Sequence, residues 1–259
     1  MFVKKGQILE GIVYKTPEII VQKIQEGRVR NKCYIIGNGH SLSVDGENRV
    51  VLHDPGMSMF KPKINKDYTV YAWYFPFECQ GLEAASRDLA KFVKSDCYQK
   101  FTKIAVIGHS KCGFCAAMVK EQCSYVKAVT VSTPWKGTFM ADAVLIRERT
   151  DNTLVLKIHD GIFSNHNVDK DITPKSKLVK REFYVDVMIA SKLEFFSDCC
   201  NPIDAFLFFW DNILDVNGDG IVPFGSQLNC ECEKIRVLSS SHASSLKKGL
   251  KLLEEDELV

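Results

Sequence analysis

The chain has 259 residues, with 34 Lys and Arg against 32 Asp and Glu, so its formal net charge is only +2. This balance provides no broad positive field for a phosphate backbone, and we do not expect a dedicated nucleic-acid binder. Hydrophobic residues make up 46% and charged residues 25%, a composition typical of globular rather than disordered proteins. No apolar run approaches the roughly 18 residues that cross a bilayer, so no transmembrane segment is expected.

Residues 1–15 mix apolar residues with Gly and charges, and therefore do not resemble a signal peptide. The sequence contains ten cysteines, but a chain of this length builds a core without disulfide staples. We expect a cytoplasmic protein with reduced thiols, most of which act as small core hydrophobes. The pattern predicts one domain over residues 1–259 and leaves the oligomeric state open.

The first part of the chain has β-like character. Apolar runs at 32–44 and 49–56 flank the turn-forming DGEN at 45–48, which predicts a hairpin. Residues 67–75 are rich in β-branched and aromatic side chains, as in a buried strand. Apolar residues then recur on one face of a predicted helix at 81–95.

Strand and helix continue to alternate through the middle of the chain. The short apolar run at 101–110 predicts a strand, CGFCAAMVKEQC at 112–123 predicts a helix, and KAVTVSTP at 127–134 predicts another strand. Such alternation implies parallel strands joined by crossover helices. The predicted fold class is therefore α/β, with a mostly parallel central sheet and helices on both faces.

The last part of the chain is less regular. Residues 136–201 are more charged, with short helical stretches such as FYVDVMIASKLEFF at 183–196. The apolar run at 205–214 predicts a central strand, 233–242 predicts another, and 244–255 predicts an amphipathic helix. So long a stretch between core strands predicts a helical cap or lid insertion at about residues 138–201.

The junction KIAVIGHSKCG at 103–113 carries the clearest chemistry. A predicted buried strand delivers Ser110 into a tight turn, and a helix begins at once, so free N–H groups lie beside the hydroxyl. This junction resembles the nucleophile elbow of α/β-hydrolases, G-x-S-x-G. Gly108 and Ser110 match, whereas Cys112 takes the second glycine position and Gly113 follows one place later.

A nucleophilic serine needs a base and an acid that orients it, and in this family the chain order is Ser, Asp or Glu, His. His242, after the last predicted strand, takes the base position, and Asp219 in GDGIVP takes the acid position. Asp215 and Asp211 compete with Asp219. The segment VSTPWKGT at 131–138 also resembles the family, and the matching segments span roughly residues 68–254.

The resemblance is to the lipase and esterase branch of the α/β-hydrolases. It implies hydrolysis of carboxylic esters through an acyl-enzyme, a small-molecule ester or lipid as substrate, and no metal or organic cofactor. The backbone N–H of Lys111 is the first expected oxyanion donor, and a loop at 37–41 or 53–58 supplies the second. His109, on the turn beside Ser110, is expected to pack against or support the elbow.

Three alternatives stay open. A non-catalytic binding protein can have the same fold. Cys112 and Cys115 form a C-x-x-C at a helix start, as in thiol redox proteins. The stretch from Asp215 to Asp219 begins like a calcium-binding EF-hand loop, although Ser226 stands where such a loop places Glu. A zinc site at these cysteines with Cys230 and Cys232 has no typical spacing.

Overall fold

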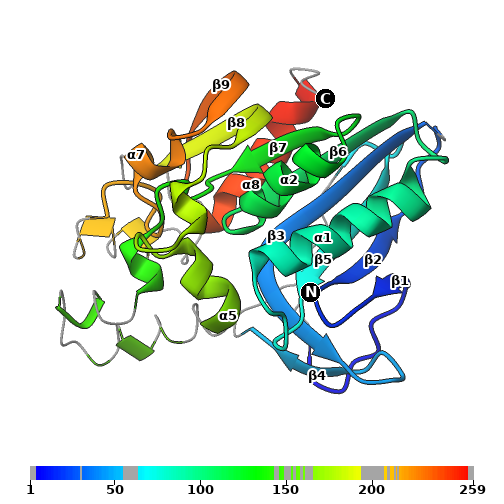
Figure 1. Cartoon of the computed structure of the whole chain (residues 1–259), viewed down its shortest axis with the longest axis horizontal. Helices are drawn as coiled ribbons and strands as arrows, with labels where there is room; N and C mark the ends of the chain where they lie inside the picture. Colours follow the sequence, from blue (N-terminus) through cyan, green and yellow to red (C-terminus); the bar gives the residue numbers. More distant parts are fainter. Residues whose placement is uncertain are drawn as a thin grey trace.

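A central sheet dominates the computed structural model of the chain (Figure 1). The structure describes residues 4–29, 31–54, 64–142, 146–148, 153, 156, 157, 160, 166–193, 207, 208, 211, 212, 214 and 216–255. Within these residues the sheet has nine strands in the order β1-β2-β5-β3-β6-β7-β8-β9, with β4 paired to β3 alone. The strands are β1 (Ile12–Lys15), β2 (Ile20–Gln25), β3 (Lys32–Val44), β4 (Val50–His53), β5 (Thr69–Phe75), β6 (Lys103–His109), β7 (Lys127–Val131), β8 (Tyr184–Lys192) and β9 (Glu231–Ser239).

Strand pairing divides the sheet into an antiparallel edge and a parallel centre. The pairs β1–β2, β2–β5 and β3–β4 are antiparallel, and β5, β3, β6, β7, β8 and β9 pair in parallel. The β3–β4 pair is the hairpin predicted around DGEN. Because the ends of parallel strands meet at one edge of a sheet, residues that follow β6, β7 and β8 lie close together.

Helices cover both faces, as the alternation predicted. The helices are α1 (Leu82–Phe92), followed by the π-helical η1 (Val93–Cys97), α2 (Cys112–Gln122), α5 (His166–Asp169), α7 (Phe224–Gln227), α8 (His242–Glu255), and the short 3₁₀ segments η2 (Phe139–Ala141), η3 (Lys170–Ile172) and η4 (Leu178–Lys180). Ile35 packs in one core with α1 and α2, whereas its neighbour Ile36 packs in the core beneath α8. This period of two is that of a strand buried on both sides.

Two sequence predictions are wrong: a predicted helix is a strand, and a predicted strand is helical. FYVDVMIASKLEFF was expected to be helical, but its residues 184–192 form β8 in the centre of the sheet. The run 205–214 was expected to be a strand, but its described residues are helical. A short continuous apolar run fits a two-sided buried strand and a buried helix equally well, because both bury side chains all round.

The correction also changes the predicted cap. Strand β8 lies inside the segment 138–201 that was assigned to an insertion, so a core strand interrupts that segment. The part before β8 contains only short helical segments among its described residues. That part stays a candidate cap. Among the described residues, no helix is long and apolar enough to cross a membrane.

Candidate active site

The turn after β6 holds Ser110 in a left-handed conformation, with φ of 55°. Close packing fixes the small residues around it. A Cβ on Gly108 would lie 2.2 Å from the carbonyl oxygen of Cys112, and a Cβ on Gly113 would lie 1.8 Å from Thr133 Oγ1. Any side chain at either position would therefore collide with the turn or the neighbouring strand end. The glycine required at the start of α2 is thus Gly113, which explains how Cys112 replaces glycine in the motif.

Ser110 is half-buried, and its hydroxyl makes no hydrogen bond to any described residue. Its backbone N–H donates to the carbonyl of Val131, the last residue of β7, at 2.9 Å. The helix α2 begins two residues later, at Cys112, so the first N–H groups of that helix lack intrahelical acceptors. The hydroxyl therefore lies beside the first N–H groups of α2, of which that of Gly113 donates to the carbonyl of Ser110 at 3.0 Å.

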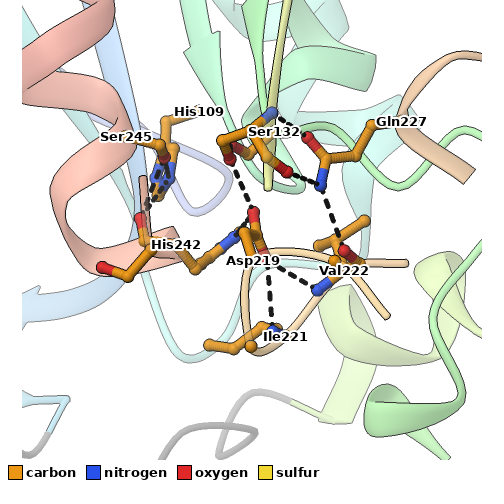
Figure 2. A network of polar contacts seen from close by, with 12 residues as sticks. His109, Ser132, Asp219, Ile221, Val222, Gln227, His242 and Ser245 are labelled. Atoms are coloured by element: carbon orange, nitrogen blue, oxygen red, sulfur yellow. Dashed lines mark hydrogen bonds and ion pairs between the residues drawn. The ribbon is translucent and has the colours of Figure 1, made fainter. Parts of the chain in front are cut away.

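Asp219 and His242 form a buried hydrogen-bonded pair, drawn at the centre of Figure 2. The ring Nδ1 of His242 lies 2.8 Å from Oδ2 of Asp219, whose side chain is 0% exposed. The other carboxylate oxygen accepts N–H groups from Ile221 at 3.1 Å and Val222 at 2.8 Å. With Nδ1–H donating to a carboxylate, Nε2 of the neutral ring is the proton acceptor.

The carboxyl of Asp219 stays ionised despite its burial. Burial raises its pKa. This effect is outweighed by His242, through its charge and hydrogen bond, and by the N–H groups of Val222 and Ile221, so the pKa of Asp219 lies below the ordinary value. Asp211 holds the same loop, because its carboxylate accepts the N–H groups of Gly218 at 3.0 Å and Gly220 at 3.1 Å. Of the three competing acids, Asp219 contacts the imidazole, and Asp215 lies outside the described residues.

His109 joins the nucleophile turn to the His242 segment. Its Nδ1 lies 3.2 Å from the carbonyl of Asn38, and its Nε2 lies 3.0 Å from Ser245 Oγ and 3.1 Å from the carbonyl of His242. Both ring nitrogens face a carbonyl oxygen, and the Ser245 hydroxyl beside Nε2 donates to the His242 carbonyl at 3.0 Å, so the ring is held between the nucleophile turn and the start of α8. Burial, together with the neighbouring His242, lowers the pKa of His109 to about 3, so the ring is neutral. These contacts agree with the expectation that His109 stabilises the elbow.

These contacts bring the predicted site residues to one edge of the sheet. The rings of His109 and His242 lie 4.6 Å apart between centroids, and Ser110 follows His109 directly. Among the described residues, no hydrogen bond joins the Ser110 hydroxyl to the His242 ring. Hydrogen bonds of this kind are often long in unliganded enzymes and tighten when substrate binds.

The two candidate oxyanion loops differ in their contact with Ser110. Residues 37–41, expected to form a loop, lie within β3, where its pairing with β5 is irregular between Gly37 and Ser41. Gly39 there has φ of 84°, and a Cβ on it would lie 3.5 Å from Ser110 Cβ. Its N–H donates to Cys112 Sγ at 3.1 Å. In the other loop, Asp54 accepts the N–H of Ser41 at 2.5 Å, and residues 55–58 lie outside the described part. Among the described residues, the 37–41 segment is thus in contact with the elbow.

Lys111 has a side chain of unexpected importance. Its ammonium lies 2.6 Å from Asp169 of α5, 5.9 Å from the centroid of the Phe75 ring, and only 6% of the residue is exposed. Burial lowers its pKa, but Asp169 more than offsets this, so the net pKa is raised and the lysine stays charged. This ion pair links Asp169 of the candidate cap to Lys111, the residue that follows Ser110.

The rival sites find little support. Cys112 and Cys115 are completely buried, and burial raises the pKa of both thiols well above the ordinary value, so neither is a ready thiolate. Among the described residues, no cluster of three His, Cys, Asp or Glu side chains could hold a metal ion. The first predicted calcium ligand, Asp215, lies outside them.

Sequence reasoning missed the residues that surround Asp219. Ser191, at the end of β8, donates a hydrogen bond to Asp219 Oδ2 at 3.0 Å. Gln227 of α7 holds the backbone of Ser191 on both sides, through Oε1 at 2.7 Å and Nε2 at 2.9 Å. A serine at the carboxyl end of a core strand is a detectable signal. It was hidden because this segment was predicted to be helical.

No family model and no curated protein sequence matches the chain. Solved structures do match it. A lipase of Bacillus licheniformis in its mature form is 13% identical, with a TM-score of 0.57, over 95% of this chain and 100% of that one. A meta-cleavage product hydrolase of Pseudomonas fluorescens is 12% identical, with a TM-score of 0.50, over 96% of this chain and 97% of that one. Such low identities carry the fold and not the activity. The strand order, the crossover helices and these neighbours together show that the chain has the α/β-hydrolase fold.

Proposed function

We propose that the protein is a serine hydrolase of carboxylic esters, with Ser110 as nucleophile, His242 as base and Asp219 as the acid that orients His242. The observation that carries this proposal is the buried Asp219–His242 hydrogen bond of 2.8 Å. It leaves the basic ring nitrogen available at the sheet edge where Ser110 stands on its turn. A second support is the half-buried hydroxyl of Ser110 beside the start of α2.

The reaction is built from these roles. His242 Nε2 takes the proton of Ser110 as its oxygen attacks the ester carbonyl, and the N–H of Lys111 with a donor of the 37–41 segment binds the resulting oxyanion. The imidazolium then gives the proton to the leaving alcohol, which leaves an acyl-enzyme on Ser110. Water, activated by the same ring, releases the acid and restores the serine. Asp219 stabilises the imidazolium throughout.

Ester hydrolysis tests this proposal against a binding protein with the same fold. We expect the wild type to hydrolyse p-nitrophenyl acetate, and Ser110→Ala and His242→Ala each to lose at least roughly 10³-fold in kcat/KM. Ser86→Ala is the matched control, because it removes a buried hydroxyl that contacts Glu83 and Met118, remote from the site. A folded wild type without turnover would favour the binding protein. The observation that supports this alternative is that no hydrogen bond joins the Ser110 hydroxyl to the His242 ring among the described residues.

We further propose an apolar acyl-binding region beneath the candidate cap. The support is that the segment after β7 carries partly buried apolar side chains packed against the core that α1 and α2 share, namely Phe139, Ala141 and Leu156. Each methylene buried there contributes about 0.8 kcal/mol, or roughly fourfold in kcat/KM. kcat/KM should therefore rise from p-nitrophenyl acetate toward butyrate and octanoate. A steady fall from acetate onward would indicate a small closed pocket and retain an esterase without lipase character.

The cytoplasm is the compartment that we propose. The eight described cysteines are free thiols, as expected in a reducing environment.

A further inference from the structure

Two serine hydroxyls lie in a row behind the candidate acid. Ser191 Oγ is 3.0 Å from Asp219 Oδ2, and Ser132 Oγ is 2.5 Å from Ser191 Oγ. All three side chains are 0% exposed. Ser132 comes from the end of β7, Ser191 from the end of β8, and Asp219 from the loop that precedes α7, so the row is built from three separate elements.

Charge fixes the direction of these hydrogen bonds. An ionised carboxylate only accepts, so Ser191 donates its proton to Asp219. The proton shared by the two hydroxyls must then come from Ser132. The result is an aligned chain in which each hydrogen bond polarises and strengthens the next.

The surroundings hold this chain in one geometry. Gln227 is 1% exposed and binds the N–H and C=O of Ser191, and its Nε2 also donates to the carbonyl of Val222 at 3.0 Å (Figure 2). Ser132 has φ of 51°, which is uncommon for a residue other than glycine, and its N–H donates to the carbonyl of Ile189 at 2.9 Å. Strain of this kind persists where the surrounding contacts over-determine the conformation.

We propose that Ser191 and Ser132 are positioning residues that weaken the hold of Asp219 on the proton of His242. The inference rests on the proposed function. Asp219 Oδ2 is shared between the imidazole and the Ser191 hydroxyl, so part of its negative charge is neutralised by the serine chain. The imidazolium is then less stabilised and returns its proton more readily to the leaving alcohol.

Four charged or titratable groups of the described residues lie around the pair. His109 from β6 and His40 from β3 lie on the imidazole side, and Asp211, with Lys192 of β8 near it, lies on the carboxylate side. Removing a serine hydroxyl alters none of these groups. A change in the protonation of His242 in a serine variant would therefore report on the hydroxyl chain.

Histidine NMR titration tests the inference without relying on catalysis. The His242 resonance is assigned with His242→Gln, and its titration midpoint is compared in the wild type, Ser191→Ala, Ser132→Ala and the control Ser86→Ala. We expect the midpoint to rise by roughly half to one pH unit in Ser191→Ala, since charge-assisted hydrogen bonds are strong. A smaller rise is expected in Ser132→Ala, which keeps the Ser191–Asp219 bond, and none in Ser86→Ala.

An unchanged midpoint in both folded serine variants would overturn the inference. If Ser191→Ala does not fold, Ser132→Ala alone decides, because an unchanged midpoint there contradicts the aligned chain. The acid limb of the pH profile of kcat/KM should move in the same direction. A wild type that titrates as expected but hydrolyses no ester would contradict the proposed function and leave the hydroxyl chain in place.

Discussion

Two serines of this protein have similar left-handed backbone conformations in separate turns, each at the end of one of two neighbouring parallel strands. Ser110 follows β6 with φ of 55°, and Ser132 follows β7 with φ of 51°. Each donates its N–H to a carbonyl of the next strand in the sheet, Ser110 to Val131 of β7 and Ser132 to Ile189 of β8, both at 2.9 Å. The backbone alone therefore does not distinguish a candidate nucleophile from a supporting residue.

The segments that come after the two turns differ. After Ser110 the helix α2 begins at Cys112 and leaves its first N–H groups beside a half-exposed hydroxyl. After Ser132 the described residues 133–138 form no helix, and the hydroxyl is completely buried against Ser191. Helix donors and exposure, added to the turn, therefore create the conditions for nucleophilic catalysis.

The largest expected effect on kcat comes from Asp219, which is hydrogen-bonded both to His242 and to the Ser191–Ser132 pair. Asp219→Asn keeps the shape but removes the charge that stabilises the imidazolium, so kcat should fall by roughly 10⁴-fold. Asp215→Asn, the neighbouring acid in the sequence, is the matched control and should retain most activity. Steady-state hydrolysis of p-nitrophenyl acetate measures both. The opposite ranking would move the acid to Asp215.

The residue after Ser110 is the charged Lys111, and the next largest effect is expected on the free energy of unfolding when this charge is removed. Lys111→Met leaves the buried Asp169 carboxylate without its ammonium and should cost about 3–5 kcal/mol of unfolding free energy. Thr133, after Ser132, is neutral. Lys91→Met, which removes an ion pair with an exposed lysine, should leave the urea midpoint unchanged. An equal result for the two lysine variants would mean that the buried pair does not stabilise the elbow.

The turn at Ser110 also depends on close approach to the turn at Ser132. Gly113→Ala would place a Cβ 1.8 Å from Thr133 Oγ1, and overpacking of this kind costs about 1–3 kcal/mol. Gly46→Ala is the control, since a Cβ there meets nothing within 4 Å. Thermal unfolding of the two variants compares them. Similar melting temperatures would show that the two turns are not in tight contact.

The residue before each serine predicts a pH effect of smaller size. His109 has a pKa of about 3 when folded, below the unfolded value, so the unfolded chain binds the proton first. The contribution of neutral His109 to the free energy of unfolding is complete above about pH 6.5. It is lost as the pH falls toward 3, by at most about 1.4 kcal/mol per pH unit. His109→Gln should flatten the fall in unfolding free energy between about pH 6 and 4. Parallel pH curves for the two proteins would exclude a buried neutral His109.

The two turns also differ in how far the sequence predicts them. The turn at Ser110 was predictable because its signals are local: an apolar strand, small residues and a helix succeed one another in KIAVIGHSKCG. The parallel sheet and helices on both faces were predicted from the same kind of alternation, and the structure confirms them.

The support around Ser132 could not be predicted in this way. The Ser132–Ser191 and Ser191–Asp219 contacts join residues 59 and 28 positions apart. Such contacts depend on which strands become neighbours, and β8 was mistaken for a helix because its residues are apolar on both faces. The contact between the 37–41 segment and the elbow likewise depends on the fold, which places Gly39 beside Ser110.

Covalent labelling compares the two serines most directly. A fluorophosphonate reacts preferentially with a serine activated by a base, and peptide mapping by mass spectrometry identifies the residue that carries the label. We predict one label per chain on Ser110, lost in Ser110→Ala and His242→Ala and retained in Ser132→Ala and Ser86→Ala. A folded protein that takes no label, or that carries it on another residue, would contradict the assignment of Ser110 as the nucleophile.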